Sequence, residues 1–214
     1  MSEPLWIDQP AELLRRLESA PPRIGLDIEF IRERTYWPRL ALVQMAVGAE
    51  ILLVDPLVPD MPAAIAAWLD APGVLKVMHS ASEDLIAFKF ACDTLPRPMY
   101  DTQVAAALAG IGSGLGYQKL VGQVAGITLP KGETRSDWLQ RPLSELQVRY
   151  AAEDVLHLVA VYRALLARLA PQQVECILED GSELVSNLGR DVAPQAPWRD
   201  AKLAWKLSRQ QQAV

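Results

Sequence analysis

The stretch RIGLDIEF, residues 23–30, decides the fold of this chain because its side chains alternate strictly between two faces. Such alternation predicts a β-strand with one buried side. The apolar side chains share one face: Ile24, Leu26, Ile28 and Phe30. The opposite face carries a glycine and two acids: Gly25, Asp27 and Glu29.

Further strands and helices follow from the chain on either side of this stretch. Residues 40–47 are almost continuously apolar, which is typical of a central strand, and residues 51–54 predict a third strand after a short turn at Gly48. Connections this tight join antiparallel neighbours. A later strand is expected at 74–78, and helices at 8–19, 61–70, 80–91, 104–109, 117–125, 145–169 and 172–188. This order predicts an α/β fold with a mixed sheet flanked by helices.

The composition favours a globular protein that works inside the cell. Half of the 214 residues are hydrophobic and 22% are charged. We find neither a secretory signal nor an apolar run of the roughly 20 residues that span a bilayer, so no membrane partner is expected. The only cysteines, Cys92 and Cys176, lack metal-type spacing and fit a reducing compartment, so we expect the cytoplasm. The net charge of −5 argues only mildly against nucleic acid.

Three acids in the first half of the chain could carry chemistry. Asp27 and Glu29 project from one strand face, where two carboxylates repel each other unless a cation lies between them. A solvated polar face explains this pair equally well. Asp84 lies in the first turn of the helix at 80–91, where an acid usually complements the helix dipole. A capping box of Ser80 and Glu83 is expected to start this helix.

Tyr150 and Asp154 are one helical turn apart and share a face of the helix at 145–169. Taken alone, core packing of the tyrosine and a surface position for Asp154 is the simpler interpretation. Ser144 and Gln147 predict a capping box at the start of this helix. The glycines between 110 and 116 never form the G-x-G-x-x-G pattern and predict a loop, not a phosphate cradle.

Three ordered motifs resemble those of a known enzyme family. They are LDIEFIRERTYWPRLALVQ at 26–44, HSASEDL at 79–85 and KGETRSDWLQRPL at 131–143, the last continuing to YAAEDV at 150–155. They resemble the exonuclease motifs of ribonuclease D, within the tyrosine subclass of the DEDD exonuclease superfamily. The resemblance covers about residues 5–190. Ile28 departs from it, since threonine is common there.

The resemblance implies a ribonuclease H-like domain and a 3′–5′ exoribonuclease that releases 5′-mononucleotides by two-metal-ion hydrolysis. Two Mg²⁺ or Mn²⁺ ions would be bound by the carboxylates Asp27, Glu29, Asp84 and Asp154. Tyr150 would orient the attacking water. The implied contacts to a substrate are Ile28 through its backbone, Phe30, Gln44, His79, Lys131 and Arg135, with Arg141 as a further phosphate candidate. The implied partner is RNA with a free 3′ end, such as a tRNA precursor.

Two other functions stay open. A DNA-directed exonuclease of the same superfamily differs only in recognition of the 2′-hydroxyl, and a catalytically silent RNA-binding module would not need all four acids and Tyr150. We expect the exonuclease domain to span 1–190. Residues 191–214 resemble the linker into a helical accessory (HRDC-type) domain, and without such a domain RNA binding should be weaker and more salt-sensitive.

Overall fold

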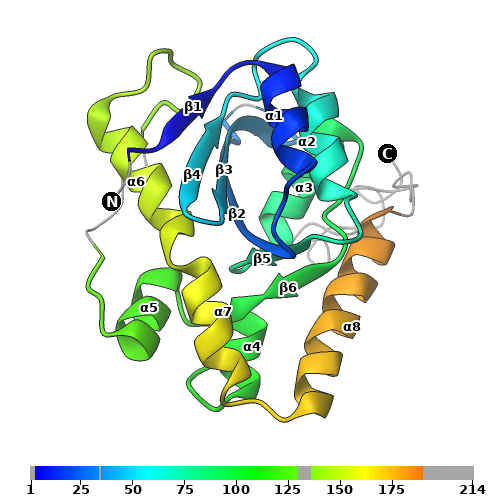
Figure 1. The fold of residues 1–214 in the computed structure, drawn as a ribbon, viewed down its shortest axis with the longest axis vertical. Helices are drawn as coiled ribbons and strands as arrows, with labels where there is room; N and C mark the ends of the chain where they lie inside the picture. The colour runs from blue at the N-terminus through cyan, green and yellow to red at the C-terminus, as the bar shows by residue number, and fades with distance from the viewer. Residues whose placement is uncertain (1–2, 34, 130–135, 190–214) are drawn as a thin grey trace, which may run out of the picture.

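A six-stranded mixed sheet lies between two layers of helices in the computed structural model, which describes residues 3–33, 35–129 and 136–189 (Figure 1). The strand order is β1-β4-β3-β2-β5-β6. The strands are β1 (Leu5–Ile7), β2 (Arg23–Ile31), β3 (Arg39–Val47), β4 (Glu50–Val54), β5 (Leu75–Met78) and β6 (Met99–Asp101).

The middle of the sheet confirms the predicted topology. β2, β3 and β4 pair as antiparallel neighbours, and β2 then pairs with β5, and β5 with β6, in parallel. Gly48, with φ at +63°, makes the turn between β3 and β4. In the register of β2 with β3, Asp27 lies opposite Gln44, so both side chains leave the same face of the sheet. A bulge between Glu29 and Phe30 shifts this register, and the pairing then continues to Ile31.

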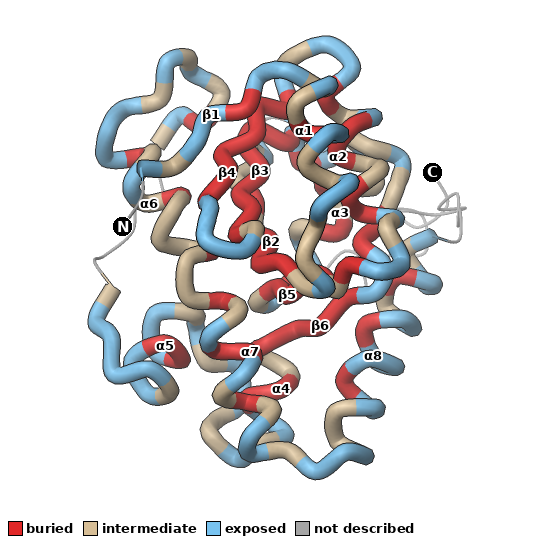
Figure 2. The backbone as a smooth tube through the Cα atoms, in the orientation of Figure 1, coloured by how far each residue is buried: buried red, intermediate tan, exposed pale blue. Residues whose placement is uncertain are grey.

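The helices divide between the two faces of the sheet. The first face is covered by α1 (Pro10–Leu17), α2 (Met61–Leu69) and α3 (Ser82–Cys92). The second face carries α4 (Thr102–Leu108), α5 (Tyr117–Ala125), α6 (Glu145–Leu156) and α7 (Leu158–Leu166). α8 (Pro171–Gly189) packs on β6 and α3. Figure 2 shows the strands as the buried centre between these layers. No helix in the described ranges is both long and apolar enough to cross a bilayer.

Two short strands, β1 and β6, were not expected from the sequence. Each has only three residues and lies at an edge of the sheet, where β1 pairs in parallel with β4 and β6 with β5. Three residues are too few to show an alternation of period two. The strands at 23–30, 40–47, 51–54 and 74–78 are confirmed within a residue or two.

The single helix predicted at 145–169 is wrong, because the chain turns at His157 and forms two helices. α6 packs over β2, β3 and β4, whereas α7 packs over β2 and β5. One straight helix of that length would extend for roughly 37 Å and leave the sheet. The break lets both halves stay in contact with the sheet, and Figure 1 shows the change of direction between them. The predicted capping box of Ser144 and Gln147 is confirmed.

The predicted capping box of Ser80 and Glu83 is also wrong. Ser80 has a left-handed φ of +58°, and α3 starts only at Ser82, with no side-chain cap from its own N-terminal residues. Glu83 pairs instead with Arg32, whose Nη1 donates to its Oε2 over 2.9 Å. The backbone at the start of α3 is bound by a residue from β6, described below.

Candidate active site

Gly25 lies where the end of α6 and the start of α7 come into close contact with β2. A Cβ on Gly25 would lie 3.1 Å from the Val155 carbonyl oxygen, 3.1 Å from the Leu158 Cβ and 3.2 Å from the Ala46 Cβ. These distances are tighter than most Cβ contacts, so an alanine here would require α6, α7 or β3 to shift by a few tenths of an ångström. Asp154 precedes Val155 on α6, and Asp27 follows Gly25 by two residues on β2. The glycine therefore favours a close approach of the elements that carry the two acids.

Four carboxylates from three separate elements meet at this contact. Asp27 and Glu29 come from β2, Asp84 from the first turn of α3 and Asp154 from α6. Burial, and then the negative charges of Asp84, Asp154 and Glu29, raise the pKa of Asp27 well above its usual value. Asp27 thus interacts electrostatically with all three other acids, which indicates that it lies at the centre of the cluster.

The other three acids are perturbed in the same direction. Burial raises the pKa of Glu29 to about 8, with Asp154 and Asp84 adding to the shift. Burial also raises the pKa of Asp84 to about 8, together with the charge of Asp101, and raises that of Asp154 to about 7. All four keep partial access to solvent. Such a cluster is stable near neutral pH only with bound protons or with a cation.

The donor set fits hard divalent cations. Carboxylate oxygens without sulfur or imidazole partners are the ligands that Mg²⁺ and Mn²⁺ prefer. In the parts of the chain that the structure describes, no three His, Cys, Asp or Glu side chains already form a closed metal cage. Mutual repulsion of the four carboxylates is consistent with this open arrangement, because no ion pair between these acids and a basic side chain is found in residues 3–33, 35–129 and 136–189.

Tyr150 lies beside the cluster on the same face of α6 as Asp154. Its hydroxyl hydrogen-bonds the Asp154 carboxylate, and burial followed by the charges of Asp154 and Glu29 raises the pKa of Tyr150. The phenol therefore stays protonated and can act as a donor. The ring packs near Trp138, with centroids 6.0 Å apart. The simpler interpretation is thus half right: Tyr150 packs against the second core, but Asp154 is partly buried and not at the surface.

A buried polar side chain next to the cluster lacks partners. Both amide atoms of Gln44 are buried and have no hydrogen bond within the described residues, and Gln44 lies opposite Asp27 in the sheet. Unpaired buried polar groups are costly, so Gln44 points to a ligand or water at the acids. Tyr117 also lies near the acids: burial, with the charges of Asp154 and Asp27, raises its pKa, and an interaction with the His157 backbone opposes this shift. Sequence reasoning missed Tyr117, which no motif contains.

Asp101 binds the backbone that leads into α3, the helix of Asp84, and also caps α4. Its Oδ1 accepts from the Gln103 backbone N–H (2.7 Å) and from that of Ser80 (3.0 Å). Its Oδ2 accepts from the Ala81 N–H (2.9 Å). One buried carboxylate thus fixes the first residues of both α3 and α4.

His79 contacts protein with both ring nitrogens. Nδ1 lies 2.9 Å from the Thr102 hydroxyl, and Nε2 lies 3.0 Å from the Leu115 carbonyl oxygen. The same carbonyl accepts from the Gln103 side chain (3.0 Å). Burial lowers the pKa of His79. His79 therefore fixes the loop at 110–116 against the end of β5.

The structure supports some of the remaining expected substrate contacts and not others. The Ile28 side chain is buried in the first core, so only its backbone can face the acids, as expected. Phe30 is half-buried at the edge of that core. Lys131 and Arg135 lie outside the described residues. Arg141 is committed elsewhere, because its guanidinium pairs with both oxygens of Asp55 at 2.7 Å and donates to the Ala41 carbonyl. Its assignment as a phosphate contact is therefore wrong.

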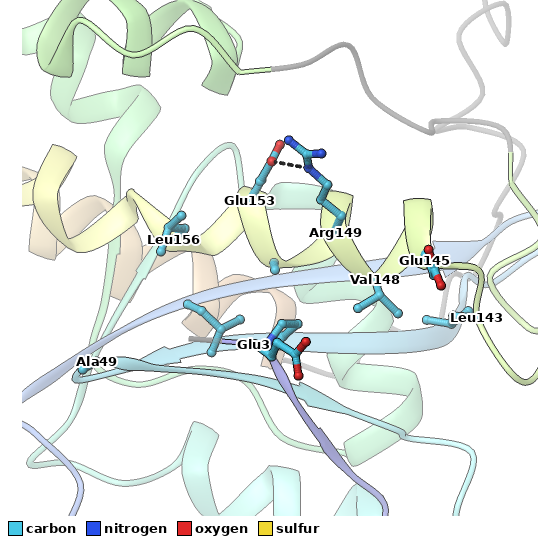
Figure 3. Close-up of a pocket in the computed structure, with 11 residues that line it drawn as sticks. Glu3, Ala49, Leu143, Glu145, Val148, Arg149, Glu153 and Leu156 are labelled. Atoms are coloured by element: carbon cyan, nitrogen blue, oxygen red, sulfur yellow. Dashed lines mark hydrogen bonds and ion pairs between the residues drawn. The ribbon is translucent and has the colours of Figure 1, made fainter. Parts of the chain in front are cut away.

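A groove of about 500 Å³ lies on the opposite side of α6 (Figure 3). Val148, Ala152 and Leu156 line it at helical spacing, and an ion pair of Arg149 with Glu153 (3.1 Å) crosses its rim. Tyr150 and Asp154 project from another face of the helix. The groove is mainly apolar and does not include the acid cluster, so the chemistry is assigned to the cluster.

The comparisons with known proteins agree with this geometry. The sequence model of the 3′–5′ exonuclease family matches residues 6–170, which include all four acids and Tyr150. The chain belongs to this family. Ribonuclease D of Xanthomonas oryzae pv. oryzae is 58% identical over 196 residues, which are 91% of this chain and 54% of that protein. Ribonuclease D of Pseudomonas paraeruginosa is 47% identical over 211 residues, 98% of this chain and 56% of that protein.

Among solved structures, the crystal structure of Escherichia coli RNase D, an exoribonuclease involved in structured RNA processing, has a TM-score of 0.84 and 35% identity. The match covers 97% of this chain and 56% of that structure's chain. The chain thus spans about half the length of the relatives it matches. The ribonuclease H-like fold expected from the sequence is confirmed by this structural match.

Proposed function

We propose that this chain is the catalytic domain of a metal-dependent 3′–5′ exoribonuclease that removes 5′-mononucleotides from RNA 3′ ends. The observation that carries the proposal is the convergence of Asp27, Glu29, Asp84 and Asp154, all with raised pKa values. The family and the similarity to ribonuclease D support it. We assign the domain to residues 1–190 and the linker to 191–214.

The four carboxylates would bind two divalent cations, Mg²⁺ or Mn²⁺. When bound, such ions activate a water and stabilise the leaving 3′ oxygen of an in-line displacement. Asp27, as the central acid, is suited to contact both ions. The protonated Tyr150 hydroxyl, already paired with Asp154, would orient the attacking water by donating or accepting a hydrogen bond.

The substrate would enter with its 3′ end at β2. The backbone around Ile28 and the exposed part of Phe30 lie beside Glu29, where they could contact the terminal nucleotide without reading its base. We retain Gln44, His79, Lys131 and Arg135 as substrate contacts in this proposal. For His79 the contact must avoid the two ring nitrogens, which are already bonded. Among RNAs, tRNA precursors are the proposed substrate class.

The test uses RNA labelled at its 5′ end, incubated with Mg²⁺, Mn²⁺ or EDTA. We expect a ladder that shortens from the 3′ end with either metal, no products with EDTA, and no products from an Asp27→Ala variant that melts cooperatively. A DNA strand of the same sequence runs in parallel. Faster cleavage of the DNA would replace the proposal with a DNA-directed exonuclease, and metal binding without any cleavage would replace it with a silent RNA-binding module.

A further inference from the structure

Three aromatic side chains form an exposed group on α3 and on the connection that follows β2, which we call the aromatic platform: Tyr36, Trp37 and Phe90. Trp37 and Phe90 stack with ring centroids 3.9 Å apart and an interplanar angle of 23°. Tyr36 meets Trp37 edge-on at 4.5 Å. The exposed fractions are 62% for Tyr36, 42% for Trp37 and 47% for Phe90. Clustered exposed aromatic rings are typical of a binding surface.

The platform has a fixed place in the fold. Tyr36 and Trp37 belong to the connection between β2 and β3, and Phe90 belongs to α3. Pro38, directly after Trp37, is buried, and the ion pair of Arg32 with Glu83 (2.9 Å) joins the same connection to the first turn of α3. The rings are thus held at two points against the helix that carries Asp84.

The platform lies on the elements that carry the acids, or directly after them. Phe90 follows Asp84 by six residues on α3, an axial rise of about 9 Å, and its side chain leaves a different face of the helix. Stacked nucleotides repeat at roughly 3.4 Å along one strand, so this rise is comparable to about three nucleotides. The connection that carries Trp37 begins directly after β2, which carries Asp27 and Glu29. Both parts of the platform thus lie only a few residues along the chain from a proposed metal ligand.

We propose that the aromatic platform stacks on bases of the RNA strand two to four nucleotides upstream of its 3′ end. This inference rests on the proposed function. Stacking on aromatic rings tolerates every base, as a degrading enzyme requires. Arg32 and Arg39 are exposed at the two ends of the same connection and supply positive charge for phosphates. The exposed ion pair of Arg32 with Glu83 contributes little stability, so a phosphate can displace it.

The first experiment compares Trp37→Ala and Phe90→Ala with Leu108→Ala, a control on the exposed surface of α4. Thermal melting verifies that each variant folds. We expect kcat/KM to fall roughly tenfold on a ten-nucleotide RNA for the two platform variants, near the effect of losing one stacked base. On a dinucleotide, which ends before the platform, all variants should match wild type. Trp37→Phe, which keeps a ring, should retain most of the activity on the long RNA.

The second experiment walks a single abasic nucleotide along the RNA, one position at a time from the 3′ end. Wild type should slow when the missing base is two to four positions upstream, whereas Trp37→Ala should be insensitive at those positions. Equal sensitivity of wild type and Trp37→Ala at every position would contradict base stacking on the platform. Equal losses of kcat/KM by the platform variants on the dinucleotide and on the long RNA would contradict it too. A wild-type enzyme without metal-dependent cleavage of any RNA would instead overturn the proposed function.

Discussion

Replacing Asp27 by asparagine should stabilise the metal-free protein while it abolishes activity. The substitution keeps the shape of the side chain and removes the central charge of the cluster. Burial and the charges of Asp84, Asp154 and Glu29 raise the pKa of Asp27 well above its usual value, so the folded protein disfavours its charged form at high pH. Asparagine removes this charge, whereas the burial of the other three acids persists. We therefore expect a gain of about 1–2 kcal/mol, or a melting temperature higher by about 2–8 °C.

The stability gained by Asp27→Asn should increase with pH. An acid whose pKa is raised on folding binds more protons when folded, so stability is retained below about pH 4 and is lost as the pH rises toward 8. The gain of Asp27→Asn should thus be large at pH 8.5 in EDTA and nearly absent at pH 5. Added Mg²⁺ should raise the melting temperature of wild type more than that of the variant.

Melting curves at pH 5 and 8.5, with EDTA or with Mg²⁺, measure this directly. Asp180→Asn, an exposed acid on α8, is the matched control and should change neither curve. The reasoning fails if Asp27→Asn melts at or below the temperature of wild type at pH 8.5 in EDTA. It also fails if its gain is the same at both pH values, since that gain would not come from charge.

Four further substitutions probe the surroundings of the acids. Tyr150→Phe should lower kcat about 100-fold with little change in KM or in stabilisation by Mg²⁺, measured by steady-state kinetics and melting; a full rate would exclude a role for its hydroxyl. Gly25→Ala should cost about 1–3 kcal/mol in urea unfolding, because its Cβ would be crowded by Val155 and Leu158. Arg141→Ala should cost about 3 kcal/mol, because Asp55, directly after β4, loses its charged partner. Unchanged stability would show that this ion pair does not stabilise the fold. Gln44→Leu should leave stability unchanged or higher, because its amide has no partner in the described structure; a loss in chemical denaturation would reveal a bond to the protein.

The alternation of residues 23–30 was enough to predict β2 and the side on which Asp27 and Glu29 project. The periodicity of residues after 145 likewise placed Tyr150 and Asp154 on one helical face. In both cases the signal is local, since neighbours in sequence determine which face a side chain takes. The acid cluster itself was anticipated only through its resemblance to a family, because no local pattern indicates that β2, α3 and α6 meet.

The errors have physical causes of the same kind. The helical periodicity of residues 145–169 continues on both sides of His157. Periodicity therefore could not show that the helix ends there and that a second helix follows the sheet. Ser80 and Glu83 match a capping box, but the donors at the start of α3 are bound by Asp101, which lies 20 residues away. Trp37 and Phe90 are 53 residues apart, so their stack was equally invisible in the sequence.

The three hydrogen bonds of Asp101 have a consequence for its tolerance to substitution. Its two oxygens are both used as acceptors, so the amide of an asparagine would leave the Ala81 or the Ser80 and Gln103 donors facing an NH₂ group. A glutamate would carry the carboxylate one methylene too far. In a saturation screen for activity, position 101 should therefore look as restricted as the acids themselves. Intolerance at this position would result from the loss of backbone hydrogen bonds at the starts of α3 and α4, and not from the loss of a contact with a reacting atom.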